Sequence, residues 1–479
     1  MNAAVTAEPG HAGTGRQLQP AALPVCFLAL MLGLALLGQG RAIDVLFPLG
    51  AVGIGIHIYR RNPAHYLSYL LWLFFLTPEV RRIADFINGS YSPFSPIQTA
   101  PLIVAMLSGL TLLTHVRVLA TRRAFPTVLI LLALCYGLAI GIMRNGPLSA
   151  LYSFVGWTMP ILVGFHVLAT WRSYPGYARS LVVTFTWGLI VTGVYAFIQF
   201  ALVPPWDVFW MLHAGMGSLG EPIPYAIRVS STMNSAGPFA VMLMGGLLFM
   251  LAGRGKLVWL AALIGLVALL LTVVRSCWGG LLVGAIYALA CIERKLRIRV
   301  LLGALLVAAL AVPVFALQEF SGTVLTSMQS VADLQNDHSF QTRAEFYGNF
   351  LSVALNDISG QGFGSVGLAT KLDSSTSQLG RYGVFDSGLM EVPFVLGWPG
   401  TLMYATGLLW LLGRAVRRGL TQKSNRVISA GVGVAIALLA MMVFDNSLNG
   451  FGGLLFQLGV MLPVIGHRYG RMVATRGAS

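Results

Sequence analysis

The sequence predicts an all-α integral membrane protein with about fourteen transmembrane helices. Of its 479 residues, 56% are hydrophobic and only 10% are charged, whereas a soluble domain carries about 25% charged residues. Its mean hydropathy is +0.77. The apolar residues form long runs, and many approach the roughly 20 residues that a helix needs to cross a bilayer. The basic residues stand mostly in the short segments between these runs.

Fourteen apolar runs are candidates for spanning helices. They cover residues 21–38, 43–59, 66–78, 97–113, 125–143, 147–169, 181–203, 236–252, 257–274, 277–292, 300–317, 388–413, 427–445 and 451–467. The third run is short and the last contains Pro463, so the expected count is 12–14. No internal repeat is evident, which predicts a single membrane domain over residues 21–467. A disordered cytoplasmic tail, 1–20, and a second cytoplasmic tail, 468–479, are expected on either side of it.

The net charge of +15 would also suit a nucleic-acid-binding protein, but the placement of the charges favours a membrane protein. When the N-terminus is placed in the cytoplasm and the runs alternate, 22 of the 31 basic residues fall inside and nine outside. Cytoplasmic loops of membrane proteins are enriched in Lys and Arg. We therefore expect both termini in the cytoplasm and no nucleic-acid partner.

The four cysteines predict neither a metal site nor a disulfide. All of them lie in apolar runs, and none has the spacing of a metal ligand. They are Cys26, Cys135, Cys277 and Cys291. The sequence also lacks the HExxH, Walker A and GxGxxG motifs. We therefore interpret the cysteines as packing residues and expect no metal and no cofactor.

Two segments on the expected periplasmic side are long, namely 204–235 and 318–387. Long loops in a compact protein are usually functional. Within the second loop, Phe340, Arg343 and Tyr347 recur at helical spacing. This pattern predicts an amphipathic helix that rests on the membrane surface.

The outside arginines carry most of the functional information, because the charge bias of membrane proteins disfavours them there. Arg275 is the only charge between Leu257 and Ile292 and is expected at a tight periplasmic turn. It is either a snorkelling anchor or an anion-binding residue, since a guanidinium can bind phosphate bidentately. Arg228 is either a loop charge near the headgroups or part of a phosphate site. The second interpretation rests on the expected helix start at 236–237, just beyond it.

Several further residues are candidates for the same site. Asn234 or Ser235 is expected to cap the helix that begins near residue 236. Arg81 and Arg82 form an outside pair that is expected to bind headgroups or a substrate phosphate. Arg343 binds either a ligand or a neighbouring carboxylate such as Glu345 or Asp337.

Two residues are candidates for a base, and two glycines for a phosphate cradle. His338 is either a base or a solvated capping residue. Asp386 is either a functional carboxylate or the cap of the helix that follows it. The run GQGFGSVG contains Gly362 and Gly364, but it lacks the preceding strand and following helix of a nucleotide loop, so it is a weak signal.

Together these residues predict a periplasm-facing cavity that is ringed by arginines, with an acid and a histidine nearby. Such a cavity suits a diphosphate on a lipid carrier. Glycosyl transfer from such a carrier requires that the departing diphosphate be stabilised and the attacking hydroxyl deprotonated. Arginines can stabilise the diphosphate without a metal.

In its order of motifs the chain resembles the O-antigen polymerase and ligase superfamily, which contains the Wzy-type polymerases and the lipopolysaccharide ligases. The resemblance covers roughly residues 180 to 465. Its first two features are RVSSTMNSAGPFA and, after an apolar helix, VVRSCWGG. The third is a long loop that runs from HSFQTRAEFYGNF to GQGFGSVG, and the fourth is a polar residue, Asp386, eleven positions before Gly397.

The resemblance implies a GT-C-like fold in the inner membrane of a bacterium, with a metal-independent periplasmic active site. It implies that Arg228, Arg275 and Arg343 hold the undecaprenyl diphosphate of a lipid-linked oligosaccharide. The ligase branch often has histidine and then asparagine where this chain has Asp386 and Ser387. This departure favours a polymerase of exopolysaccharide or O-antigen repeat units, with Asp386 or His338 as the base. A chain-length regulator and other assembly proteins are expected partners.

Three alternatives remain open. An O-antigen ligase would use the same donor and transfer the glycan to lipid A core or to protein. A transporter of a small anion or a lipid-linked sugar would carry charges deep in several helices, with ligands near the midplane. A non-catalytic scaffold would tolerate the replacement of single arginines.

Overall fold

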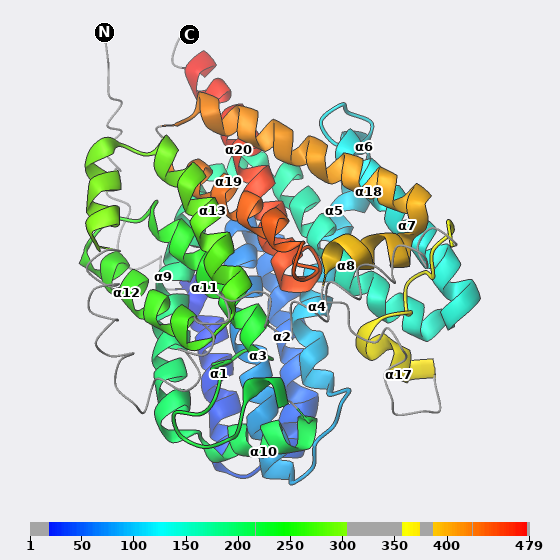
Figure 1. Ribbon diagram of the computed structural model, residues 1–479, viewed down its shortest axis with the longest axis vertical. Coiled ribbons are helices and arrows are strands. Elements are labelled where there is room, and N and C mark those ends of the chain that lie inside the picture. Colours follow the sequence, from blue (N-terminus) through cyan, green and yellow to red (C-terminus); the bar gives the residue numbers. More distant parts are fainter. Residues whose placement is uncertain (1–18, 216, 304–356, 374–386, 424, 477–479) are drawn as a thin grey trace, which may run out of the picture.

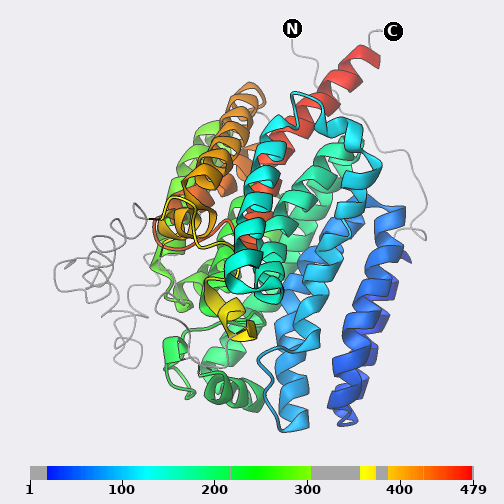
Figure 2. The same cartoon turned by 90° about the vertical axis from the view of Figure 1, so that its right-hand side faces the viewer.

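The computed structural model describes residues 19–215, 217–303, 357–373, 387–423 and 425–476, and these residues are almost entirely helical. No strand forms within them, and an isolated bridge joins Gly220 to Ile227. Most helices run roughly along the long axis of the molecule (Figures 1 and 2). The expected all-α class is therefore confirmed.

Seven helical segments are long and apolar enough to cross a membrane, judged by length and composition. They are α2 (Gly40–Arg61), η1 with α4 and α5 (Pro96–Thr114), α7 (Phe125–Asn145), α8 (Pro147–Ala169), η2 with α9 (Trp171–Leu202), α18 (Gly388–Thr421) and α20 (Gly450–Arg476). Five other apolar helices are shorter. They are α1 (Gln19–Leu36), α11 (Ala236–Met250), α12 (Lys256–Leu271), α13 (Arg275–Cys291) and α19 (Arg426–Met441). These helices support an integral membrane protein but not the count of fourteen, and most of the expected span 300–317 lies outside the described residues.

Helix α3 (Pro63–Asn88) is twice as long as the expected span 66–78. Its start is fixed by Asn62, whose side chain accepts hydrogen bonds from the backbone N–H groups of Ala64 and His65. Its end is the left-handed Gly89. The apolar run stops at residue 78, but the helix continues because its last turns carry buried charged residues that pair with one another.

Helix α20 lies at the centre of the bundle. Its most apolar stretch is 78% buried, and it packs against α8, α18 and α19. Helix α13 packs along α19, where a side chain at Gly284 would lie 2.6 Å from the carbonyl oxygen of Gly433. Small residues permit this close approach of helix backbones, as is usual in membrane bundles.

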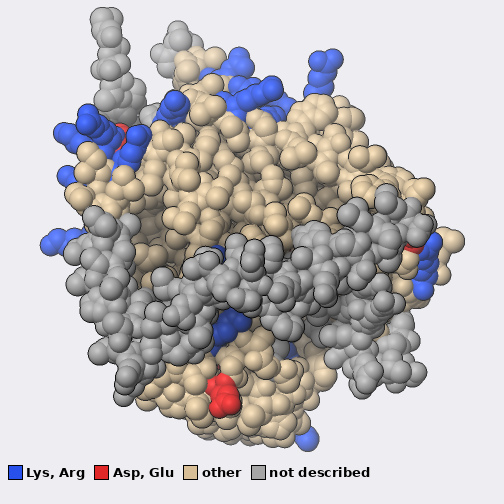
Figure 3. Space-filling model, viewed as in Figure 1, with Lys and Arg blue, Asp and Glu red and all other residues tan. Residues whose placement is uncertain are grey.

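Lys and Arg side chains gather at the end of the molecule where the C-terminus lies (Figure 3). The middle of the same face is largely free of charge where it is described. This distribution matches the separation of charges that predicts the topology. Which end faces the cytoplasm stays a prediction.

Candidate functional site

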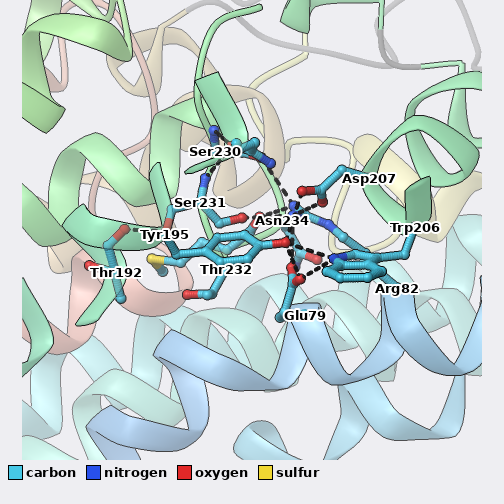
Figure 4. A network of polar contacts seen from close by, with 12 residues as sticks. Glu79, Arg82, Thr192, Tyr195, Trp206, Asp207, Ser230, Ser231, Thr232 and Asn234 are labelled. Carbon is cyan, nitrogen blue, oxygen red and sulfur yellow. Dashed lines mark hydrogen bonds and ion pairs between the residues drawn. The ribbon is translucent and has the colours of Figure 1, made fainter. Parts of the chain in front are cut away.

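Arg82 is the centre of a buried polar network (Figure 4). Its side chain is 1% exposed. Its Nη1 atom donates to Glu79 Oε2 at 3.1 Å and to Asp207 Oδ1 at 2.8 Å. The same atom donates to the carbonyl oxygen of Ser231 at 2.6 Å. Two carboxylates therefore surround one guanidinium, which satisfies the buried charge.

The network joins elements that are far apart in sequence. Asp207 stands on α10 (Pro205–Ala214), a short helix that packs across the end of α3. The hydroxyl of Tyr195 on α9 donates to Asp207 Oδ2 at 3.0 Å. Arg82 Nη2 also donates to Ser230 Oγ at 3.1 Å and to the carbonyl of Met233. The network therefore fixes the start and the end of the 204–235 loop on α3 and α9.

Arg81 is equally engaged. Its Nε atom donates to Asp85 Oδ2 at 3.2 Å, its Nη2 atom donates to the carbonyl of Ser92, and its guanidinium lies 5.0 Å from the centre of the Tyr91 ring. Both Arg81 and Arg82 are buried among protein partners. The expectation that they bind headgroups or a substrate phosphate therefore finds no support in these contacts. Arg82 holds the 204–235 loop, and Arg81 holds the segment that follows α3.

Arg228 lies near the end of the 204–235 loop, outside the network around Arg82. The side-chain oxygen of Gln199 accepts from the backbone N–H groups of Ser230 and Ser231 at 2.9 and 2.8 Å, which fixes the loop beside Arg228. Arg228 donates from Nε to the carbonyl of Thr272 at 3.2 Å and from Nη2 to that of Val273 at 3.3 Å. Both carbonyls belong to the turn between α12 and α13. Arg228 is thereby held against the turn that precedes Arg275.

Arg275 is the first residue of α13 and lies close to Arg228. The expected tight turn is present, with Val273 in the left-handed region at φ +54°. Burial, followed by the neighbouring Arg275 charge, lowers the pKa of Arg228 below its ordinary value. Among the described residues Arg228 makes hydrogen bonds with carbonyl oxygens and no ion pair with a carboxylate. Two arginines that the chain separates by 47 positions are therefore neighbours in the fold.

Two adjoining cavities open between the helices. The first, of about 280 Å³, lies between α3, α4, α8 and α11 and is lined by Gln98 and Asn234. The second, of about 400 Å³, lies between α8, the glycine run and the start of α18. Leu102 and Tyr152 line both. Together the cavities are of the size of a small-molecule site.

Asn234 does not cap α11, and neither does Ser235, which occupies the N-cap position without a side-chain hydrogen bond. The expected cap is therefore wrong. The Asn234 side-chain oxygen instead accepts a hydrogen bond from Gln98 Nε2 at 2.9 Å, on the wall of the first cavity.

The second cavity is lined by two carboxylates that the sequence analysis did not select. Glu391 stands in the first turn of α18, and Asp445 stands in the turn between α19 and α20. Next to Asp445, the buried side chain of Asn446 lies beside the Glu391 carboxyl group. The available signals were a single acid inside an apolar run and the polar sequence DNSLN between two apolar runs.

Asp445 lies at the same level of the bundle as the start of α13, which carries Arg275. Asp445 is within electrostatic range of both Glu391 and Cys277. Cys277 is two residues after Arg275, and α13 packs along α19 so that Gly280 faces Met441. The start of α13 therefore stands at the level of the turn that holds Asp445.

The glycine run is a structural wedge between α7 and α18. Gly362 has φ +79°, and a Cβ atom added there would lie 2.2 Å from the backbone nitrogen of Gly141 on α7. The Gly362 N–H donates to the carbonyl of Val395 at 2.9 Å. This contact is possible because α18 is broken at Gly397, which has φ +60°. Gly364 has φ +89°, packs against Ser149 and lines the second cavity.

An ion pair anchors the start of this wedge. Arg144 Nη1 lies 2.6 Å from Asp357 Oδ2, and Arg144 Nη2 donates to Ser359 Oγ at 2.9 Å. Burial raises the pKa of Asp357, but the hydrogen bonds from Ser359 and Arg144 outweigh it, so this pKa lies below its ordinary value. The glycine run, which was expected as a phosphate cradle, is thus anchored at its start by this ion pair. Further along, Gly362 and Gly364 lie against the backbones of α7 and α8, where a larger residue would not fit.

His338, Arg343 and Asp386 lie outside the described residues, as does the expected amphipathic helix. Of the expected site residues that are described, Asn234 lines the first cavity and Gly364 lines the second, while Arg228 and Arg275 meet at the turn that precedes α13. Within the described residues no group of three or more His, Cys, Asp or Glu side chains is arranged to hold a metal.

An all-helical membrane protein with an acid-lined cavity and a pair of arginines at the start of α13 is the class that this fold and site define. Residues 260–405 match the family model described as O-antigen ligase. The match confirms the resemblance to the O-antigen polymerase and ligase superfamily and supports a function of that type. It spans α12, α13, the glycine run and the first half of α18, and thus includes Arg275 and Glu391. No curated protein matches the chain.

Proposed function

We propose that the protein polymerises lipid-linked oligosaccharide repeat units, carried on undecaprenyl diphosphate, into exopolysaccharide or O-antigen at the periplasmic face of the inner membrane. The observation that carries this proposal is the pairing of Arg228 with Arg275 at the start of α13, at the level of the turn whose Asp445 lines the second cavity together with Glu391. A positive point next to carboxylates suits a reaction in which a diphosphate leaves and a hydroxyl loses its proton.

The arginines supply the stabilisation of the leaving group. Arg228 and Arg275 come from different parts of the chain and are brought together by the 204–235 loop, so the field is built before the substrate arrives. Guanidinium groups bind phosphate oxygens bidentately and stay charged near neutral pH. Arg343, by the resemblance, is the third arginine of this set. The site is proposed to work without a metal, in a GT-C-like fold.

The reaction is a glycosyl transfer. A hydroxyl oxygen of the incoming repeat unit forms a bond with the anomeric carbon of the donor, while the bond from that carbon to the diphosphate oxygen breaks. The hydroxyl proton passes to a base, and the lipid diphosphate leaves with the electron pair. The candidates for the base are Asp386, His338 and Glu391, of which Glu391 lines the second cavity.

A polymerase is favoured over a ligase because Asp386 and Ser387 replace the histidine and asparagine that are frequent in the ligase branch. Deletion of the gene distinguishes the two. Loss of polymer with accumulation of single lipid-linked repeat units supports the polymerase. Accumulation of full-length polymer on the lipid carrier contradicts it and supports a ligase. A chain-length regulator is the proposed partner of the polymerase.

A transporter is the alternative of another class, and the charged residues of α3 bear on it. These charges lie within a helix, as a transporter predicts, but Arg81 and Arg82 are paired with Asp85, Glu79 and Asp207. A closed network of this kind suits a structural role. If a strain that lacks the gene still polymerises the glycan but no longer transports a small anion or a lipid-linked sugar, the result would support the transporter instead.

A further inference from the structure

Five arginines form a cluster at the end of the bundle where α18 and α20 finish. They are Arg123, Arg172, Arg414, Arg418 and Arg468, and they are called the basic cluster below. Arg414 Nη1 donates to the carbonyl oxygen of Arg123 at 2.6 Å and lies near the Arg123 and Arg418 charges. The Arg468 guanidinium lies near those of Arg123 and Arg172. Four chain segments therefore converge on one place.

An aromatic ring holds two of these cations together. Trp171 is buried, and the guanidinium carbons of Arg468 and Arg172 lie 4.0 and 5.3 Å from the centre of its ring. A cation within about 6 Å of a tryptophan ring is attracted by its negative face. Tryptophan is also the side chain that membrane proteins place at headgroup level.

Among the described residues, no carboxylate forms an ion pair with the basic cluster. The segments 114–124, 170–179, 414–426 and 468–479 contain neither Asp nor Glu. The acid that reaches this region from a neighbouring segment, Glu293, pairs with Arg426 at 3.2 Å. Beneath the surface, the Nε and Nη2 atoms of Arg414 are enclosed without a hydrogen-bond partner in the described part of the chain. A partly buried cation without a counter-ion is unfavourable, so an anion at this place would stabilise the fold.

The basic cluster stands about one bilayer away from the cavities. The 18 residues from Gly450 to Arg468 in α20 rise about 27 Å, close to the roughly 30 Å of the hydrocarbon core. Gly450 follows the turn that lines the second cavity. The basic cluster therefore lies near the headgroups of the opposite leaflet.

We propose that the basic cluster binds the phosphate of an anionic phospholipid headgroup, in the leaflet opposite the candidate active site. Arg123, Arg172, Arg418 and Arg468 are exposed and reach the phosphate oxygens. Arg414 supports them from below. The general enrichment of basic residues at this end does not account for the site. Arginines from four chain segments meet around Trp171 and Arg414, and among the described residues no carboxylate pairs with these arginines.

Lipid binding by the purified full-length protein tests this proposal. The variant Arg123→Gln/Arg172→Gln/Arg468→Gln is compared with wild type and with a matched control, Arg60→Gln/Arg61→Gln/Arg254→Gln. The control removes three exposed arginines that are expected on the same side of the membrane. For each protein in neutral detergent, the apparent affinity is measured from the shift in unfolding temperature on addition of phosphatidylglycerol, phosphatidylcholine or inorganic phosphate.

The proposal predicts that phosphatidylglycerol stabilises wild type and the control equally, and that phosphatidylcholine has little effect. In the cluster variant the affinity for phosphatidylglycerol falls roughly 100-fold, because the variant removes three arginines that each contribute about 1 kcal/mol near the phosphates. An equal affinity in the cluster variant and the control overturns the proposal. A response to inorganic phosphate as strong as that to phosphatidylglycerol also overturns it, because the site then binds a free anion.

If the triple variant does not fold, the single variant Arg468→Gln replaces it. Native mass spectrometry then counts the phosphatidylglycerol molecules that remain on the protein. Fewer retained molecules than on wild type support the site, and an unchanged number contradicts it.

Discussion

Arg82 and Arg275 look alike in the sequence, because each is an arginine next to an apolar run on the expected periplasmic side. In the structure Arg82 is enclosed by Glu79 and Asp207, whereas Arg275 begins a helix beside a second arginine. The sequence does not show this difference, because one partner of Arg82, Asp207, stands more than 100 positions away from it. At the scale of the residue, these partners give Arg82 a structural role in holding the 204–235 loop, whereas Arg275 stands beside Arg228 at the start of α13.

The variant Arg82→Ala is expected to lower the stability of the protein by about 3 to 5 kcal/mol, because it leaves two carboxylates buried without their cation. The measurement is the unfolding temperature in detergent, together with the amount of protein in the membrane. Arg60→Ala removes an exposed arginine and is expected to change stability by no more than about 0.5 kcal/mol. Normal stability of Arg82→Ala, combined with loss of polymer, would show instead that Arg82 touches substrate.

The variant Glu391→Gln tests whether this carboxylate is the base. The glutamine keeps the shape of the side chain but accepts no proton, so we expect the rate of polymer formation to fall by about 100-fold or more. Membrane levels and unfolding temperature are expected to stay close to wild type. An unchanged rate would leave Asp386 and His338 as the candidates.

At the scale of the element, the close approach of backbones determines the shape of the second cavity. Gly362 and Gly364 replace side chains with direct backbone contacts to α7 and α8, and Gly397 interrupts α18 where the run meets it. The broken helix turns Glu391 toward the cavity while the rest of α18 continues to the basic cluster.

The variant Gly362→Ala is expected to displace this run, because the new Cβ atom would lie 2.2 Å from the nitrogen of Gly141 and the residue has φ +79°. We expect a lower unfolding temperature and reduced polymer formation. The control is Gly279→Ala in α13, where a Cβ atom meets nothing within 4 Å. Alanine favours the helix there, so stability is expected to be equal or slightly higher. Equal unfolding temperatures and equal polymer formation in the two variants would contradict the structural role of the glycine run.

The apolar runs predict most helices to within a few residues, because long hydrophobic periodic segments are the strongest signal in a membrane sequence. Helix α3 was predicted too short because its buried charges look like the end of a span. The break at Gly397 was not predicted, because it depends on the glycine run that packs there from elsewhere in the chain.

At the scale of the whole molecule, the two ends of the bundle have different chemistry. The end with the cavities holds Glu391, Asp445 and the Arg228–Arg275 pair, and the opposite end carries the basic cluster. Arg228 and Arg275 were each predicted from the sequence as anion-binding candidates. Their convergence was expected from the cavity ringed by arginines and from the family resemblance. The contacts that bring them together were not predicted, because they depend on Gln199 and on the network around Arg82, which hold the 204–235 loop against the start of α13. Glu391 and Asp445 were not predicted because both fall within apolar runs, where a single acid gives no sign of the cavity that it lines.

The most direct test of the central claim is the replacement of Arg275 by Ala and by Lys, with Arg41→Lys as a control for an exposed arginine expected on the same side. Membrane levels are confirmed first, and extracellular polymer and lipid-linked repeat units are then measured. We predict that polymer falls by about 100-fold or more in both Arg275 variants while lipid-linked units accumulate, because lysine cannot bind a phosphate bidentately. Normal polymer in both variants would show that Arg275 is only a membrane anchor and would contradict the proposed diphosphate site.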